Sequence, residues 1–161
     1  MQMGRVRARA SYAGGYGNRA GISCLGVTDT MSTRRSIEVP GFHHAGLPIP
    51  AASRVGNIVV TGGIHGMDPE TGKLPDDVSE QGALMFANLK RILSAAGASL
   101  DDVVKMTFWV KIPEARPVIN QGWLAAFPDP ASRPARHTLQ NDHMPANMVV
   151  QCDALAVITG G

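Results

Sequence analysis

From about residue 50 onward, the pattern of apolar, polar and turn-forming residues predicts short strands and helices. Residues 51–55 and 58–61 read as two strands, and the second consists entirely of β-branched residues, which favour extended structure. They flank Gly56-Asn57, and both of these residues tolerate the positive φ that a two-residue hairpin turn requires. The pattern therefore predicts a β-hairpin over residues 51–61.

A single apolar stripe predicts the first helix. Its members fall at positions i, i+4, i+7, i+8 and i+11, which is the spacing of one helix face: Met85, Leu89, Ile92, Leu93 and Ala96. Asp76 or Asp77 can cap the start of this helix, and Gly97 stands where a glycine commonly ends one. The run 99–102 (Ser-Leu-Asp-Asp) then has the composition of a capping box that leads into a strand.

The second half of the chain continues the alternation of strands and helices. Residues 103–110 predict a strand, 114–127 a helix, 136–140 a short strand and 147–158 the last and longest strand. Val118, Trp123 and Phe127 are the expected core contacts of the second helix. The resulting order, β-β-α-β-α-β-β, predicts an α+β fold with both helices on one face of a single sheet. Because no third helix is available for the other face, the pattern favours an oligomer that covers it.

Residues 1–30 differ from the rest of the chain. They hold Arg5, Arg7, Arg9 and Arg19 against a single acid, Asp29, and show no strand or helix periodicity. Three interpretations stay open: an over-called start with Met31 as the true initiator, a targeting peptide without the apolar region of a secretory signal, or a basic arm. We expect this segment to be a disordered extension, and residues 31–161 to form a single domain.

Composition and charge narrow the classes of function. A chain of 161 residues with 44% apolar and 17% charged residues is typical of one globular domain. The net charge is +2, and outside the first thirty residues the chain is close to neutral, which argues against a nucleic-acid partner. No apolar run reaches the roughly 18 residues that a membrane span needs. With only Cys24 and Cys152, and Cys152 expected as a buried free thiol, the sequence fits the reducing cytoplasm.

Residues 45–158 resemble the RidA (YjgF-type) family. The resemblance is carried by short motifs in family order and at family spacing: 55–57 (Val-Gly-Asn), 61–62 (Thr-Gly), 68–72 (Asp-Pro-Glu-Thr-Gly), 88–90 (Asn-Leu-Lys), 95–97 (Ala-Ala-Gly), 101–105 (Asp-Asp-Val-Val-Lys), Asn120, 134–136 (Pro-Ala-Arg) and 153–157 (Asp-Ala-Leu-Ala-Val). It implies a chorismate-mutase-like homotrimer with active sites at the subunit clefts. It also implies hydrolysis of 2-imino acids such as 2-iminobutanoate and 2-iminopropanoate to keto acids and ammonia, without cofactor or metal.

The same resemblance implies the site residues. Arg136 holds the family's position for a fork that binds the substrate carboxylate, and Asp153 holds that of the acid that moves protons. Thr138, on the same strand face as Arg136, is implied at the substrate, and so are Thr61, Gly62 and Asn120. Two alternatives remain: Arg136 as an ordinary surface ion-pair residue, and Asp153 as the partner of an arginine from a neighbouring subunit.

The chain departs from the family pattern at three positions. Ile49 stands where the family commonly has a tyrosine, so a phenolic hydroxyl is missing from the expected pocket. Asp153 is one methylene shorter than the family's glutamate, which moves the carboxylate back by about 1.5 Å. Gly63 replaces a glutamine. These changes indicate a different or larger substrate, such as a pathway-specific imine or enamine.

The histidines leave their role open. His43 and His44 precede the predicted hairpin, while His137 and His143 flank the strand at 136–140. His44 is a candidate pocket residue that could replace the missing tyrosine, whereas His137 should face away from Arg136 because strand side chains alternate. No spacing among them is typical of a metal site.

Three functions compete on these residues. The first is imine or enamine deamination by Arg136 and Asp153. The second is a non-catalytic trimer that binds small carboxylates, and the third and least favoured is an RNA-directed nuclease or translation inhibitor, for which the expected basic, aromatic-lined groove is missing from the composition.

Overall fold

The computed structural model describes residues 34–159 of the chain, so the expectations for residues 1–30, Cys24 and Met31 lie outside the described residues. Its strands are β1 (Arg35–Ile37), β2 (Ala52–Val55), β3 (Ile58–Thr61), β4 (Ile64–His65), β5 (Val103–Val110), β6 (Ala135–Gln140) and β7 (Val150–Val157). Its helices are α1 (Val78–Ala95) and α2 (Ala115–Ala126), with short 3-10 turns at Leu100–Asp102 and Pro130–Ser132.

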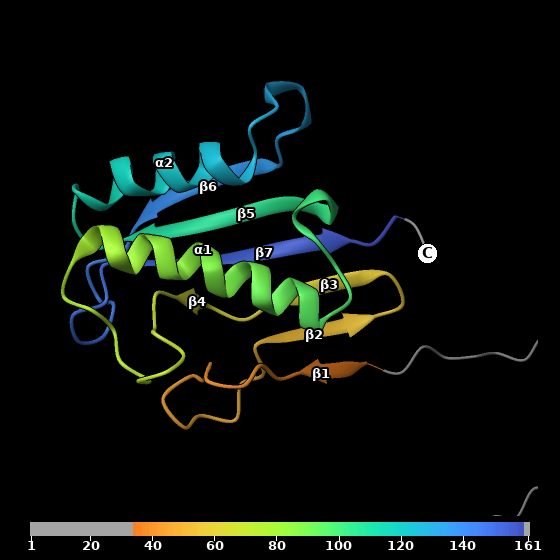
Figure 1. Cartoon of the computed structure of the whole chain (residues 1–161), viewed down its shortest axis with the longest axis horizontal. Coiled ribbons are helices and arrows are strands. Elements are labelled where there is room, and N and C mark those ends of the chain that lie inside the picture. Colours follow the sequence, from red (N-terminus) through yellow and green to blue (C-terminus); the bar gives the residue numbers. More distant parts are fainter. Residues whose placement is uncertain (1–33, 160–161) are drawn as a thin grey trace, which may run out of the picture. The chain divides into compact units, whose positions relative to one another are not determined.

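The strands form one mixed sheet in the order β1-β2-β3-β7-β5-β6, and β4 extends it by pairing with β7 (Figure 1). All pairs are antiparallel except β5 and β6, which run parallel and are joined by α2. A parallel pair needs such a crossover because the chain must return to the starting edge before the second strand. In this strand order, β7, which is the last strand in the sequence, lies in the middle of the sheet.

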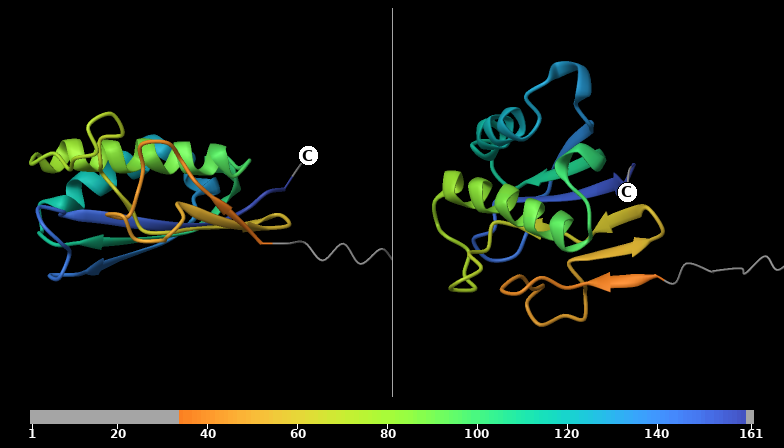
Figure 2. Two further views of the ribbon diagram at one scale, coloured as in Figure 1. Left: turned by 90° about the horizontal axis from the view of Figure 1, so that it is seen from below. Right: turned by 45° about the vertical axis from the view of Figure 1, so that its right-hand side comes forward.

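Both helices cover the same face of the sheet, as the sequence predicted (Figure 2). Strand residues that point toward the helices are buried, for example Met106 and Phe108 of β5 and Cys152 and Ala154 of β7. They meet the buried stripe of α1 and Trp123 of α2 in one hydrophobic core. The opposite face of the sheet carries no layer of secondary structure within the described residues (Figure 2).

The ends of α1 follow the expected capping chemistry. The Asp77 side chain accepts a hydrogen bond from the backbone N–H of Glu80 at 2.8 Å, which identifies Asp77 rather than Asp76 as the cap. Gly97 has a φ of +77°, and the N–H of Ala98 donates to the carbonyl of Leu93, which together make a Schellman ending. The capping box at Ser99 is also present, on a 3-10 turn.

Three expectations about elements were incomplete. The strands β1 and β4 were missed because three and two residues are too short to show a period. The last strand begins at Val150 instead of 147, because the Asn147 side chain binds the carbonyl oxygens of Leu74 and Pro75 and fixes a turn there; β7 is as long as β5, at eight residues each. In α2, Val118 is only half-buried, and its neighbour Ile119 enters the core instead.

Candidate functional site

Arg136 lies on the helix-covered face of β6, beside α2. Its Nη2 donates a hydrogen bond of 2.8 Å to Oδ1 of Asn120, and its guanidinium carbon lies 5.1 Å from the ring centroid of Trp123 and 5.8 Å from that of Phe108. These aromatic faces attract the cation and orient its plane. Partial burial lowers the pKa of Arg136 from its ordinary value, and an arginine remains charged in such a setting. The structure thus brings together Arg136 and Asn120, two of the residues selected from the sequence.

Thr138 lies two residues further along the same face. It is in register with Phe108, and its hydroxyl oxygen is buried with no hydrogen-bond partner among the described residues. A buried hydroxyl without a partner costs free energy, so Thr138 has hydrogen-bonding capacity next to Arg136 that the described chain leaves unused.

Asp153 lies on the opposite face of the sheet. Arg136 is in register with Met106 of β5, whereas Asp153 is in register with Thr107. Adjacent residues of a strand point to opposite faces, so the two side chains diverge within one copy of the chain. The half-buried Asp153 carboxylate accepts a hydrogen bond of 3.2 Å from the backbone N–H of Thr107.

Thr61 is the last residue of β3, Gly62 follows it directly, and both are tightly packed. The Thr61 hydroxyl is buried and accepts a hydrogen bond of 2.9 Å from the backbone N–H of Ala154, which ties β3 to β7. A Cβ atom added at Gly62 would lie 3.0 Å from the carbonyl oxygen of Pro50 and 3.1 Å from the His44 ring. The Thr61 side chain is therefore engaged in the fold, and Gly62 leaves room for the His44 ring.

Ile49 lines a pocket of about 190 Å³ between the segment after β1, strand β4 and the start of β7. The pocket also holds two residues whose convergence the sequence did not show, His65 of β4 and Gln151 of β7, which are in register with each other. His44 stands in the same lining, as the sequence suggested. We call this cavity the Ile49 pocket, and its lining includes His44, Leu47, Ile49, His65, Met148 and Gln151.

His44 links the loop of Ile49 to the end of β3. Its Nδ1 lies 3.1 Å from the carbonyl oxygen of Ile49, and its Nε2 lies 2.8 Å from that of Gly63. Gln151 closes against the same glycine, because a Cβ atom at Gly63 would lie 2.3 Å from the Gln151 amide nitrogen. Glycine at position 63 thus makes room for the Gln151 side chain.

His65 forms the buried side of the Ile49 pocket. Its ring stacks on Phe42 at a centroid distance of 4.9 Å, and its Nε2 lies 3.2 Å from the carbonyl oxygen of His43. Burial lowers the pKa of His65 to about 4, partly opposed by the His43 hydrogen bond. The buried Asn88 of α1 holds the backbone of this strand by donating to the carbonyl oxygens of His65 and Met67.

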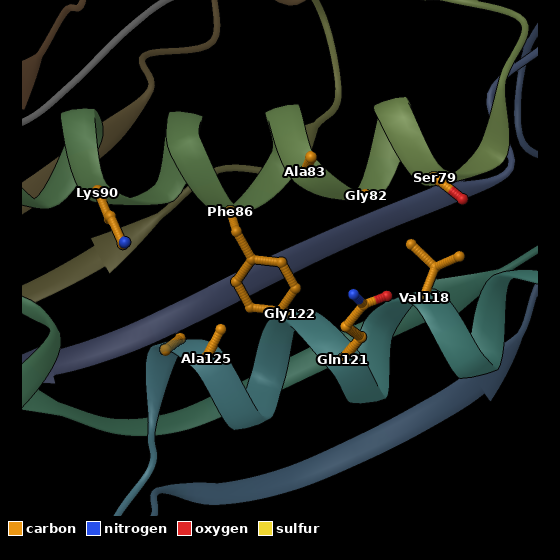
Figure 3. Close-up of a pocket in the computed structure, with 10 residues that line it drawn as sticks. Ser79, Gly82, Ala83, Phe86, Lys90, Val118, Gln121, Gly122 and Ala125 are labelled. Atoms are coloured by element: carbon orange, nitrogen blue, oxygen red, sulfur yellow. The ribbon is translucent and has the colours of Figure 1, made fainter.

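A separate groove of about 420 Å³ runs between α1 and α2, and Figure 3 shows it. Glycines let the helices approach: a Cβ atom at Gly122 would lie 2.3 Å from the Phe86 ring, and one at Gly82 would lie 2.2 Å from Val118. None of the residues selected from the sequence as site residues lines this groove, and Lys90 is the charged residue in its lining. Its features are those of helix packing.

The remaining histidines and the cysteine lie apart from Arg136. His137 is in register with Thr107, so it faces away from Arg136 as expected, and its Nδ1 lies 3.1 Å from Nζ of Lys105. His143 lies in the turn after β6. Cys152 is fully buried, and burial together with the neighbouring Asp153 charge raises the pKa of its thiol, so it stays a free, unreactive thiol.

Between residues 34 and 159, no group of three or more His, Cys, Asp or Glu side chains is arranged to hold a metal ion. Neither α1 nor α2 combines the length and the apolar character that a membrane crossing needs.

Comparisons with known proteins agree with one another. The family model described as "Endoribonuclease L-PSP" matches residues 48–158. A RutC family protein of Pyrococcus abyssi is 34% identical over 110 residues, which cover 68% of this chain and 85% of that protein. The 2-iminobutanoate/2-iminopropanoate deaminase of Escherichia coli K12 is 33% identical over 104 residues, which cover 64% of this chain and 81% of that protein. The crystal structure of RidA from an Antarctic Psychrobacter superimposes with a TM-score of 0.70 at 32% identity, covering 77% of this chain and 99% of that one.

Proposed function

The chain belongs to the Endoribonuclease L-PSP family, which includes the RidA (YjgF-type) proteins, and from this premise we propose that it hydrolyses small reactive imines or enamines. The observation that carries the proposal is the setting of Arg136. Its guanidinium is held by Asn120 and two aromatic rings and keeps further N–H donors for a ligand. A planar, negative carboxylate matches such a fork, and 2-imino acids carry one. The named activity of the Escherichia coli relative supports the same class of substrate.

In the proposed reaction, water adds to the carbon of the C=N bond. The new C–O bond forms as the C=N π electrons move to nitrogen, and a carboxylate accepts a proton from the water. The protonated carboxyl group passes this proton to the nitrogen. The hydroxyl of the tetrahedral intermediate then loses its proton to the carboxylate as the C=O bond forms and the C–N bond breaks, and the nitrogen takes up that proton and leaves as ammonia. We assign the proton transfer to Asp153, and the orientation of the substrate to Arg136, with Asn120 fixing the guanidinium.

The proposal includes a homotrimer. Arg136 and Asp153 diverge within one copy of the chain, so they can serve one substrate only if a neighbouring copy supplies one of them. The open sheet face, where Asp153 lies, also carries exposed apolar side chains that association would cover, among them Val55, Ile58 and Val60. Both observations favour a site that is completed between subunits.

A coupled assay tests this function. Threonine dehydratase generates 2-iminobutanoate from threonine, semicarbazide traps the imine, and formation of the semicarbazone is followed with and without the protein. We expect the wild type to suppress the semicarbazone and Arg136→Ala to lose the effect by 100-fold or more, because loss of the fork leaves the carboxylate unpaired (on the order of 3 kcal/mol). Arg116→Ala, at an exposed arginine of α2, is the matched control and should behave as the wild type.

Asp153→Asn separates turnover from binding. If the protein is a deaminase, the Asp153→Asn variant should no longer suppress formation of the semicarbazone. It should still bind a carboxylate ligand such as 2-oxobutanoate, which calorimetry measures. Suppression by Asp153→Asn at the wild-type level contradicts the assigned proton transfer. If the folded wild type binds 2-oxobutanoate but hydrolyses no imine, the proposed deaminase activity is wrong, and the result favours a trimer that only binds carboxylates.

A further inference from the structure

The Ile49 pocket is continuous with positions that the family resemblance assigns to the substrate. Ile49 forms part of its wall, and the His44 ring that lines it also packs against Gly62 and binds the carbonyl of Gly63. A substrate that lay against Ile49 and the backbone next to Gly62 would therefore have its remaining atoms at the mouth of this pocket.

The lining of the Ile49 pocket contains no Asp, Glu, Lys or Arg. Leu47, Ile49 and Met148 supply apolar surface. The two ring nitrogens of His44 are already engaged with the carbonyl oxygens of Ile49 and Gly63, and His65 is neutral at pH 7 because burial lowers its pKa to about 4. Such a lining favours an apolar occupant, because polar groups would lose their contacts with water and find few replacements.

Gln151 is the polar exception. Its amide lies beside Gly63 and belongs to the lining of the pocket. A carboxamide can both donate and accept a hydrogen bond without carrying charge. It can thus bind a polar atom near the pocket mouth and leave the apolar interior unchanged.

The size of the pocket fits a branched or aromatic group. A cavity of about 150 Å³ with apolar walls holds a benzene molecule. The Ile49 pocket, at about 190 Å³, exceeds that size, and a second pocket of about 450 Å³ shares His65 and Met148 with it. The methyl or ethyl group of a three- or four-carbon imino acid would leave most of this space to water.

We propose that the Ile49 pocket binds the side chain of the substrate, and that the preferred substrates are imino acids with bulky apolar side chains, of the leucine or phenylalanine type. This inference rests on the proposed function, because it takes the substrate to be an imine. It adds Leu47, Met148 and Gln151 to the residues that determine specificity.

The first test compares imines of different size on the full-length protein. A flavin-dependent amino-acid oxidase, with oxygen and catalase, converts phenylalanine, leucine, alanine or 2-aminobutanoate to its imine in the presence of semicarbazide. The measured quantity is the protein concentration that halves the rate of semicarbazone formation. We expect this concentration to be at least about tenfold lower for the phenylalanine and leucine imines than for the alanine imine, the discrimination that a few buried methylene groups supply.

A variant that fills the pocket provides the second test. Leu47 is 61% exposed, so Leu47→Trp adds bulk at the pocket without disturbing the core. We expect it to weaken hydrolysis of the two large imines by about tenfold or more relative to hydrolysis of the alanine imine. Leu124→Trp, at a leucine of α2 that is 53% exposed and outside the pocket, should match the wild type on every substrate.

The outcomes separate this inference from the proposed function. If the wild type hydrolyses the alanine imine as well as the phenylalanine imine, or if Leu47→Trp affects large and small imines alike, the substrate preference is overturned while the deaminase stands. If no imine is hydrolysed, the proposed function fails, and the pocket is tested by calorimetry instead. Phenylpyruvate must then bind more tightly than pyruvate and lose that advantage in Leu47→Trp, or the pocket assignment fails too.

Discussion

At the scale of single residues, the site depends on polar groups whose partners come from distant parts of the sequence. Arg136 and Asn120 were both expected at the substrate from the resemblance, and they are hydrogen-bonded in the structure. The convergence of His65 and Gln151 was not predictable, because it depends on the pairing of β4 with β7. A strand of two residues leaves no pattern in the sequence from which that pairing could be read.

His65 gives the protein a predictable dependence of stability on pH. Its pKa is lowered to about 4 in the folded protein and is about 6.5 in the unfolded chain, so the unfolded state binds more protons between these values. Stability is therefore complete above pH 6.5 and falls as the pH drops toward 4. Between pH 7.5 and pH 5 we expect His65 to remove about 2 kcal/mol from the free energy of unfolding.

Urea unfolding at the two pH values measures this loss. His65→Phe keeps a ring that can stack on Phe42 and has no titrating group, so it should lose about 2 kcal/mol less than the wild type over the same interval. An equal loss in both proteins would place the pH dependence elsewhere in the chain.

At the scale of elements, local chemistry specified most of the fold and long-range pairing specified the rest. The hairpin of β2 and β3, the capped helix α1 and the strand β5 occur where their patterns predicted them. The sequence could not predict that the Arg136 and Asp153 side chains point to opposite faces of the sheet. Alternation shows which residues of one strand share a face, but the relation between β6 and β7 depends on how each of them pairs with β5.

The contact between α1 and α2 predicts an unusual effect of a glycine substitution. Gly→Ala in an exposed helix stabilises a protein by up to about 1 kcal/mol. At Gly122 the new methyl group would lie 2.3 Å from the Phe86 ring, so we expect Gly122→Ala to lower the free energy of unfolding by about 1–2 kcal/mol.

A double-mutant cycle isolates this effect. Phe86→Leu removes the ring, and in that background Gly122→Ala should cost little or become stabilising. A stabilising effect of Gly122→Ala in the wild-type background would show that Phe86 moves aside without cost.

At the scale of the whole molecule, the two faces of the sheet differ. Helices cover one, and the other presents Ile58, Val60 and Leu139 at 46–47% exposure around the half-buried Asp153. A face with these apolar residues next to a carboxylate is suited to association that also completes a site. The sequence pointed to this oligomer by counting elements, and its number of subunits stays a prediction.

Charge on the open face tests the assembly. Val60→Glu places a carboxylate in the centre of that face, where burial between subunits would cost several kcal/mol, so we expect it to shift the protein from trimer to monomer. Because Val60 is exposed in the single chain, the fold should persist by circular dichroism. Light scattering after size exclusion gives the mass, and Leu124→Glu on α2 should keep the wild-type mass. A monomeric wild type, or a trimeric Val60→Glu, contradicts the proposed interface.

The central place of β7 also sets an order of events during synthesis. Among the described strands it leaves the ribosome last, yet it pairs with β3 and β4 on one side and with β5 on the other. Until it emerges, the β1–β4 part and the β5–β6 part have no shared strand. The nascent chain therefore carries two incomplete half-sheets with open edges, which are the kind of structure that chaperones protect from aggregation. Closure of the sheet is a late step that the final strand alone can accomplish.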